Sequence, residues 1–397
     1  MSKVVGLQPS SAKDYLAVAN DVAAQLGTQA VLLDEAAGLP TEEIQLLKQS
    51  GLLSLPIPRE YGGGGATFLD AYQVVKTLAA AQGSIGQMYA NHVVLVHAGA
   101  ALGRPGQAEQ SYRMTVEHNL FWANALNARD ARLKIVSDGD GFRVNGTKSF
   151  GTGVAIADVN AIAAIHEESG EPYVFVIPKD RGGIRYNDDW DNMGQRRTVS
   201  GSYSFENVYV AAEELVGPPP VPTSAFPTLI FLVSQLGKVF TYLGIAEGAL
   251  SAAKAYTATQ TRPWLTSGVD QATDDPYILH RYGEYWTDLQ AAIALATQAA
   301  EALQTAWQRN TDLTFEERGE VAIKAASAKA FAIKTGLTIT THMFDMMGAR
   351  ATASKYGFDR YWRDLRTFSL HDPVDYKFKA IGDWFVNETY PVPSQYS

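Results

Sequence analysis

The amino-acid sequence predicts an α+β protein in three successive parts: an N-terminal helical domain, a central β domain and a C-terminal helical bundle. Apolar residues recur at three- and four-residue spacing up to about residue 118, and again in long Ala- and Leu-rich stretches beyond residue 224. Between these regions, short apolar runs are separated by Gly, Asp and Asn, which is typical of strands. The chain of 397 residues exceeds the usual size of a single core, so we expect domains at 1–118, 119–222 and 223–397.

In the N-terminal domain, the apolar spacing predicts helices over residues 14–26, 41–50 and 68–81. The exception is GLLSLPIPREYGGGG at 51–65, where two prolines and four successive glycines exclude a regular helix. We expect an extended stretch followed by a loop in that segment.

The central runs FRVNGTKSF, ADVNAIAAI, PYVFVIP and SYSFENVYV predict a β-barrel or β-sandwich domain. The PPPVP stretch at 218–222 should end this domain as a stiff linker, because successive prolines hold the backbone extended. Helical patterns over 226–261, 277–308, 314–347 and 374–387 then predict a four-helix bundle. The polar connector at 261–277 fits either a mobile lid or a plain interhelix loop.

Composition excludes several classes of function. The net charge of -9 would repel a polyanion, so nucleic acid is not an expected partner. No basic leader with an apolar core begins the sequence and no apolar run approaches about 20 residues, so we expect a cytoplasmic protein without a membrane segment. The absence of cysteine removes thiolate catalysis, disulfides and iron-sulfur clusters, and the seven scattered histidines predict no metal site.

A Rossmann dinucleotide site is also not expected. Gly151-Thr152-Gly153 is the nearest candidate, but Ile156 stands where the third glycine should be, and strand-like runs follow where a helix should begin. The chain therefore has no predicted NAD(P)H site.

Five segments resemble the acyl-CoA dehydrogenase superfamily, in the same order along the chain. They are GLLSLPIPREYGG, GTKSFGTG, DNMGQRRTVSGSYSFENVYV, TRPW at 261–264 and YWRD at 361–364. Within the superfamily, WDNMGQRRTVSGS, MGARATASKYGFDRYWRD, LHDPVDYK and YPVPSQYS are similar to the two-component flavin monooxygenases of the dibenzothiophene monooxygenase type. The resemblance covers most of the chain and implies a flavin bound between the β domain and the helical bundle.

A flavin needs hydrogen-bond partners at its N5/O4 edge and an apolar wall against its ring. Thr152, beside Gly153, is suited to that edge, although it could equally be a turn residue. The amide of Asn124 could bond the ring or a peroxide, or close a strand end. Trp190 could stack on the flavin or belong to the core.

Arg262 and Arg350 are candidates for the flavin phosphate, because arginine grips phosphate with a fork of donors. The resemblance implies that Arg262 comes from a neighbouring subunit, and hence a homotetramer. Arg350 favours FMN, whose chain ends in a phosphate, over FAD, which stays possible. The alternative for Arg350 is a surface ion pair with a carboxylate such as that of Asp345.

The segment after YWRD decides between two reactions. An acyl-CoA dehydrogenase needs a carboxylate base, and counting from the motif places Asp372 at that position. Because Pro373 follows, Asp372 could instead cap the next helix. His371 then becomes the chemical candidate, since an imidazole could hydrogen-bond and protonate a flavin peroxide.

The resemblance implies that a separate reductase supplies reduced flavin, which reacts with O2 to give a C4a-hydroperoxide held by Thr152, Asn124 and His371. A sulfur, nitrogen or carbon atom of a small aromatic or heteroaromatic substrate would then take one oxygen. The alternatives are an FAD enzyme of the acyl-CoA dehydrogenase or nitroalkane oxidase type with Asp372 as base, and a non-catalytic flavin-binding scaffold.

Four residues are candidate walls of the substrate pocket. They are Tyr89, His92, Trp190 and Phe231. Each could equally belong to ordinary core packing.

Overall fold

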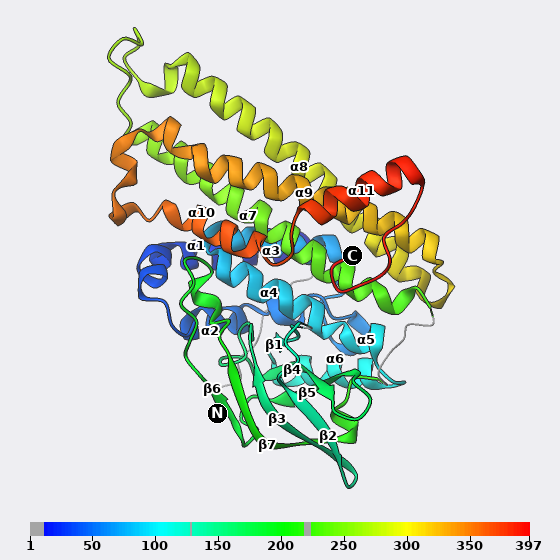
Figure 1. The fold of residues 1–397 in the computed structure, drawn as a ribbon. Coiled ribbons are helices and arrows are strands. Elements are labelled where there is room, and N and C mark those ends of the chain that lie inside the picture. Colours follow the sequence, from blue (N-terminus) through cyan, green and yellow to red (C-terminus); the bar gives the residue numbers. More distant parts are fainter. Residues whose placement is uncertain (1–11, 128, 218–223) are drawn as a thin grey trace.

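The computed structural model describes residues 12–127, 129–217 and 224–397, so the predicted linker at 218–222 lies outside the described residues. The predicted α-β-α order is confirmed: the sheet lies at one end, the N-terminal helices cover it, and the long C-terminal helices lie beyond them (Figure 1). Helix α4 (Gly83–Val96) contacts both strand β1 (Trp122–Ala125) and helix α7 (Leu229–Thr259). All three parts of the chain therefore meet around α4.

The other helices of the N-terminal part largely follow the predicted spacing. They are α1 (Ala12–Ala36), α2 (Thr41–Ser50), α3 (Phe68–Ala81), α5 (Ala98–Leu102) and α6 (Gln107–His118). Helix α1 continues well past the predicted end at residue 26, because its buried stripe of Val22, Leu26 and Ala30 runs across Gly27. Packing of this stripe outweighs the cost of about 1 kcal/mol that a glycine adds to a helix.

The proline- and glycine-containing segment at 51–65 is not extended, contrary to the prediction. It forms two short 3-10 turns, Leu52–Ser54 and Arg59–Tyr61. The chain then folds back so closely that a Cβ on Gly63 would lie 2.2 Å from the carbonyl oxygen of Ile57. Glycine is required there because only it lacks the clashing atom.

The remaining strands are β2 (Lys134–Asp138), β3 (Gly141–Lys148), β4 (Val159–His166), β5 (Pro172–Pro178), β6 (Ile184–Tyr186) and β7 (Tyr203–Ala211). They form one seven-stranded sheet in the order β1-β4-β2-β3-β7-β6, with β5 also paired to β4. Strand β1 pairs with β4 in parallel, and Asn124 of β1 forms an isolated bridge with Thr152. The sheet thus brings two of the predicted flavin residues together.

The C-terminal part contains three long helices and two shorter ones. After α7 come α8 (Pro276–Arg309), α9 (Phe315–Met347), α10 (Asp359–Ser369) and α11 (Asp375–Asn387). Helices α7, α8 and α9 pack on one another, and α10 and α11 pack on α9. Four of the five begin and end within three residues of the predicted bounds, whereas α10 was predicted only as a motif.

Within the described residues, two helices are long and apolar enough to cross a membrane, which the sequence did not lead us to expect: Tyr15–Ala36 and Phe226–Thr259. These criteria concern length and composition alone. In the second helix, 89% of the apolar window is buried inside the protein, so packing accounts for its apolar surface.

We expect the free energy of unfolding to fall as the pH drops from about 6.5 to about 4. Burial lowers the pKa of His92 and His97 to about 4 in each case. The unfolded chain takes up these protons at the ordinary pKa, so acid favours it by up to about 1.4 kcal/mol per pH unit for each of these two buried histidines. Asp364, whose pKa burial raises to about 7, acts with the opposite sign but is one group against two.

Urea unfolding at pH 7 and pH 5 measures this dependence. His97→Gln removes one of the two protons, so the difference between the two pH values should shrink. An unchanged difference would contradict the assignment.

Candidate active site

The three parts of the chain enclose one large cavity of about 1860 Å³. Its walls come from α4, β1, parts of the segment 150–200, the first turns of α7 and residues 367–373. Residues 389–397 line a further side. The cavity therefore lies where the resemblance implies a flavin.

The tail at 389–397 is held against the cavity by side chains of the bundle. Gln235 donates from Nε2 to the carbonyl oxygen of Gln395 at 3.1 Å, and Lys377 donates to the carbonyl oxygen of Tyr396. The sequence had suggested the connector at 261–277 as a lid. That connector follows the far end of α7, so it does not cover the cavity of its own chain, whereas the tail does.

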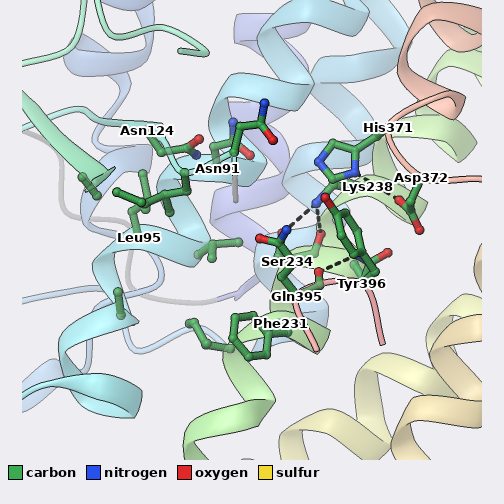
Figure 2. Close-up of a pocket in the computed structure, with 18 of the residues that line it drawn as sticks. Asn91, Leu95, Asn124, Phe231, Ser234, Lys238, His371, Asp372, Gln395 and Tyr396 are labelled. Atoms are coloured by element: carbon green, nitrogen blue, oxygen red, sulfur yellow. Dashed lines mark hydrogen bonds and ion pairs between the residues drawn. The ribbon is translucent and has the colours of Figure 1, made fainter. Parts of the chain in front are cut away.

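His371 lies on the cavity wall beside Asp372 (Figure 2). Its Nδ1 lies 3.0 Å from Oδ1 of Asp372. Burial and the nearby charge of Lys238 lower the pKa of His371 to about 4, so the ring is neutral at neutral pH. An ionised carboxylate can only accept, so Nδ1 carries the ring proton and Nε2 presents a lone pair. In this state Nε2 accepts, so the predicted donation of a proton from His371, which stays a prediction, requires that the ring first take up a proton.

Asp372 is neither a helix cap nor a free base. Helix α11 begins at Asp375 and has no side-chain cap, which overturns the capping prediction. Asp372 instead forms ion pairs with Lys329 and, at 3.0 Å, with Lys377. Although burial opposes it, the hydrogen bond from His371 and the charges of the two lysines hold the pKa of Asp372 well below its usual range. A carboxylate held in this way is a poor proton acceptor.

Thr152 and Asn124, the residues predicted for the flavin edge, lie together on another wall of the cavity. The Thr152 hydroxyl is 2.9 Å from that of Ser200, which lies 2.7 Å from the hydroxyl of Thr198. Thr198 in turn donates to the carbonyl oxygen of Gln195. The hydroxyl of Thr152 is thus oriented by a chain of partners that the sequence did not indicate.

Arg363 and Asp364, the motif residues on α10, form hydrogen bonds to the backbone of the loop 193–195 in this wall. Arg363 donates to the carbonyl oxygen of Met193 at 2.7 Å, and Asp364 accepts from the backbone amide of Gln195 at 2.5 Å. A Cβ on Gly194 would lie 2.0 Å from the carbonyl oxygen of Arg363. The motif therefore positions the loop that carries the hydroxyl chain.

Trp190 and Phe231 line the cavity, as predicted. Trp190 is fixed by a hydrogen bond from its ring nitrogen to the carbonyl oxygen of Gln195 at 2.9 Å. Tyr89 and His92 do not line it, and that prediction is wrong. Both side chains are fully buried and bond the backbone oxygens of the segment 52–53, because they occupy the opposite face of α4.

Gly153 is also absent from the cavity wall. Its amide donates to the carbonyl oxygen of Thr198, and a Cβ there would meet Met88 at 2.9 Å. The glycine thus serves close packing inside the protein.

Sequence reasoning missed many polar residues of the wall, among them Gln87, Asn91, Ser234 and Lys238. Gln87 and Asn91 are four residues apart and share one face of α4. Lys238 is the one charged residue among positions 229–246 of α7. Both patterns were visible in the sequence as polar interruptions of apolar helices.

Arg262 and Arg350 lie far from the cavity of their own chain. A helix rises by about 1.5 Å per residue, so the end of α7 near Arg262 is roughly 40 Å from Phe231. Arg350 donates to the carbonyl oxygen of Gln260 at that same end. Asp345 pairs with Arg281 at 3.0 Å, and within the part of the chain that the structure describes no ion pair joins Arg350 to a carboxylate, so the alternative of a surface ion pair is wrong.

Comparison with known proteins agrees with this geometry. The chain matches the acyl-CoA dehydrogenase N-terminal, middle and C-terminal domain families at residues 16–116, 126–208 and 236–376. It is 40% identical over 401 residues to a dibenzothiophene monooxygenase from Rhodococcus erythropolis, covering 96% of this chain and 95% of the relative. It is 39% identical over 384 residues to a probable FMNH2-dependent monooxygenase, SfnC, from Pseudomonas putida, covering 96% and 97%.

Two solved structures superpose closely on the chain. Methanesulfinate monooxygenase MsuC from Pseudomonas fluorescens has a TM-score of 0.93 and 39% identity, covering 96% of this chain and 99% of MsuC. TdsC from Paenibacillus sp. A11-2, in complex with FMN and indole, has a TM-score of 0.93 and 37% identity, covering 97% and 100%.

The fold and the cavity define a flavin-dependent oxidoreductase, and the chain belongs to the acyl-CoA dehydrogenase family. Within that family it is a flavin-dependent monooxygenase that uses FMN. The cavity fits such a cofactor: the amide of Asn124 and the hydroxyl of Thr152 offer polar partners, and Trp190 offers a flat apolar surface.

Proposed function

We propose that this chain is the oxygenating component of a two-component system, which receives reduced FMN from a separate reductase and transfers one oxygen atom of O2 to a small substrate. The substrate would present a soft or electron-rich sulfur, nitrogen or carbon atom, as an aromatic or heteroaromatic compound does. Reduced FMN supplies the two electrons that convert the second oxygen atom to water. The observation that carries the proposal is the neutral, acceptor-oriented His371 on a wall whose one nearby carboxylate, Asp372, is tied to lysines.

Within this scheme each residue has a defined task. His371 receives a hydrogen bond or a proton at Nε2, and Asp372 fixes the tautomer that makes this possible. Thr152 and Asn124 hold the polar edge of the bound flavin. The tail at 389–397 limits the access of water to the reacting atoms.

The test supplies enzymatically reduced FMN under oxygen-18 gas with three probes: dibenzothiophene, indole and methanesulfinate. We expect at least one product that carries one oxygen-18 atom. Release of only hydrogen peroxide with all three probes, together with reduction of oxidised FMN by an acyl thioester, would favour the dehydrogenase alternative.

We further infer a homotetramer in which Arg262 of one chain reaches the flavin phosphate of its neighbour. Three apolar side chains of the same region, Trp264, Leu265 and Tyr277, are 73%, 94% and 79% exposed and would be covered by a second copy. This contact would bring Arg262 to a cavity that it cannot reach in its own chain.

Arg262→Ala should weaken FMN binding by about 10- to 100-fold, the usual loss for one hydrogen bond to a charged group. Equilibrium dialysis measures the affinity, and light scattering measures the mass. Arg309→Ala, at the other end of α8, is the matched control. A protein that is monomeric and binds FMN normally after the change would contradict the proposal.

A further inference from the structure

Lys238 is a buried cation that faces the cavity without a carboxylate partner (Figure 2). The residue is 6% exposed, and its ammonium donates to the hydroxyl of Ser234 at 2.7 Å and to the carbonyl oxygen of Ser234 at 3.3 Å. No ion pair joins it to an acidic side chain among the residues that the structure describes. An ammonium has three donors, so one N–H is free to bind a ligand.

The charges around Lys238 do not balance. Lys329 and Lys377 both pair with Asp372, and His371 is neutral. Among the described residues, Asp372 is the one carboxylate in an ion pair with any of the three ammonium groups of Lys238, Lys329 and Lys377. Burial has the largest effect on the Lys238 ammonium and lowers its pKa to about 8. The nearby charge of Asp372 raises this pKa, and the charge of Lys377 lowers it. An uncompensated buried charge is costly, and an anion in the cavity would offset that cost.

Another polar group of the cavity wall also lacks a hydrogen-bond partner that a ligand could provide. Gln87 is 8% exposed, and its side-chain oxygen has no hydrogen-bond partner within residues 12–127, 129–217 and 224–397. Asn91 lines the same cavity one turn further along α4. Leu95 and Phe231 supply apolar surface nearby (Figure 2). The wall is thus built for a ligand with one polar end and one apolar end.

We infer that Lys238 and the Ser234 hydroxyl form a subsite for a negatively charged oxygen group of the substrate, which is a small organic oxyanion whose apolar body lies against Leu95 and Phe231. A sulfinate, a sulfonate and a carboxylate share this chemistry. The inference rests on the proposed function, because it names the substrate class of the same cavity. It predicts that a neutral fused aromatic compound binds less well than an anion of similar size.

Calorimetric titration in the presence of oxidised FMN tests this subsite without turnover. The probes are two matched pairs: benzenesulfinate with methyl phenyl sulfone, and benzoate with benzamide. We expect each of the two anions to bind at least about ten times more tightly than its neutral partner. The sulfinate and carboxylate pairs distinguish the two headgroups.

Lys238→Met should remove this preference and weaken the binding of the anion by about 10- to 100-fold, which is the usual effect of losing a hydrogen bond to a charged group. Lys238→Arg should keep most of it, and Lys254→Met, on an exposed part of the same helix, should change nothing. Thermal melting verifies that each variant is folded, and Lys238→Gln serves if the methionine variant is not.

Two results would overturn the inference. One is equal binding of anion and neutral partner by the unchanged protein. The other is a Lys238→Met variant that keeps the preference for anions but binds reduced FMN more weakly. That result would mean that the Lys238 ammonium contacts the flavin ring and not the substrate. Oxygen-18 incorporation into indole with no anion preference would refute this subsite and leave the proposed function intact. Anion binding without any oxygenation would support the subsite and count against the proposed function.

Discussion

Replacement of His371 by alanine is expected to lower the rate of substrate oxygenation by at least about 100-fold, within the usual range for the loss of a general acid or base. The neutral ring donates from Nδ1 to Asp372 and presents Nε2 to the cavity. Without it, the electrons of reduced FMN should leave as hydrogen peroxide. The ratio of oxygen-18 product to peroxide measures this change for the probe that the unchanged protein oxygenates.

The pH profile provides a second, independent check on His371. With its pKa near 4, the ring stays neutral between about pH 5.5 and 8, so it should add no inflection near 6.5 to the oxygenation rate. His280→Ala, an exposed histidine of α8, is the matched control. An unchanged product ratio in His371→Ala would remove His371 from the chemistry.

The sequence was most informative where one local signal agreed with packing. Helix α3 has its predicted bounds because Thr67 and Asp70 form a reciprocal cap before a regular apolar stripe. Helix α1 was predicted too short because a local rule gives weight to Gly27, whereas the buried stripe crosses it. The folded-back segment at 51–65 could not be predicted, since its turns depend on contacts with distant residues.

For the site, the sequence identified the groups next to motifs and missed those distant from them. His371, Asn124 and Thr152 line one cavity, as predicted. The face of Tyr89 was assigned wrongly, because α4 is buried on nearly all sides and its orientation stays open until its neighbours are known. Lys238 was overlooked because a lone lysine usually extends to solvent, whereas here the residue is only 6% exposed.

Asp372→Asn is expected to lower the free energy of unfolding by about 3–5 kcal/mol, the usual result of breaking a buried ion pair. The change leaves the buried ammonium groups of Lys329 and Lys377 without a carboxylate. If Asp372 only capped a helix, its replacement would lower the free energy of unfolding by only about 1 kcal/mol. Denaturant unfolding measures the difference, and Asp375→Asn, at the exposed start of α11, should change stability little.

The same variant separates a structural carboxylate from a catalytic base. An asparagine oxygen can still accept from Nδ1 of His371, so the tautomer is kept and oxygenation should fall less than in His371→Ala. Adding Lys329→Met removes one unpaired charge and should restore part of the lost stability. A proton-abstracting Asp372 would give the opposite pattern: turnover would be lost in Asp372→Asn with stability nearly unchanged, and the lysine change would restore nothing.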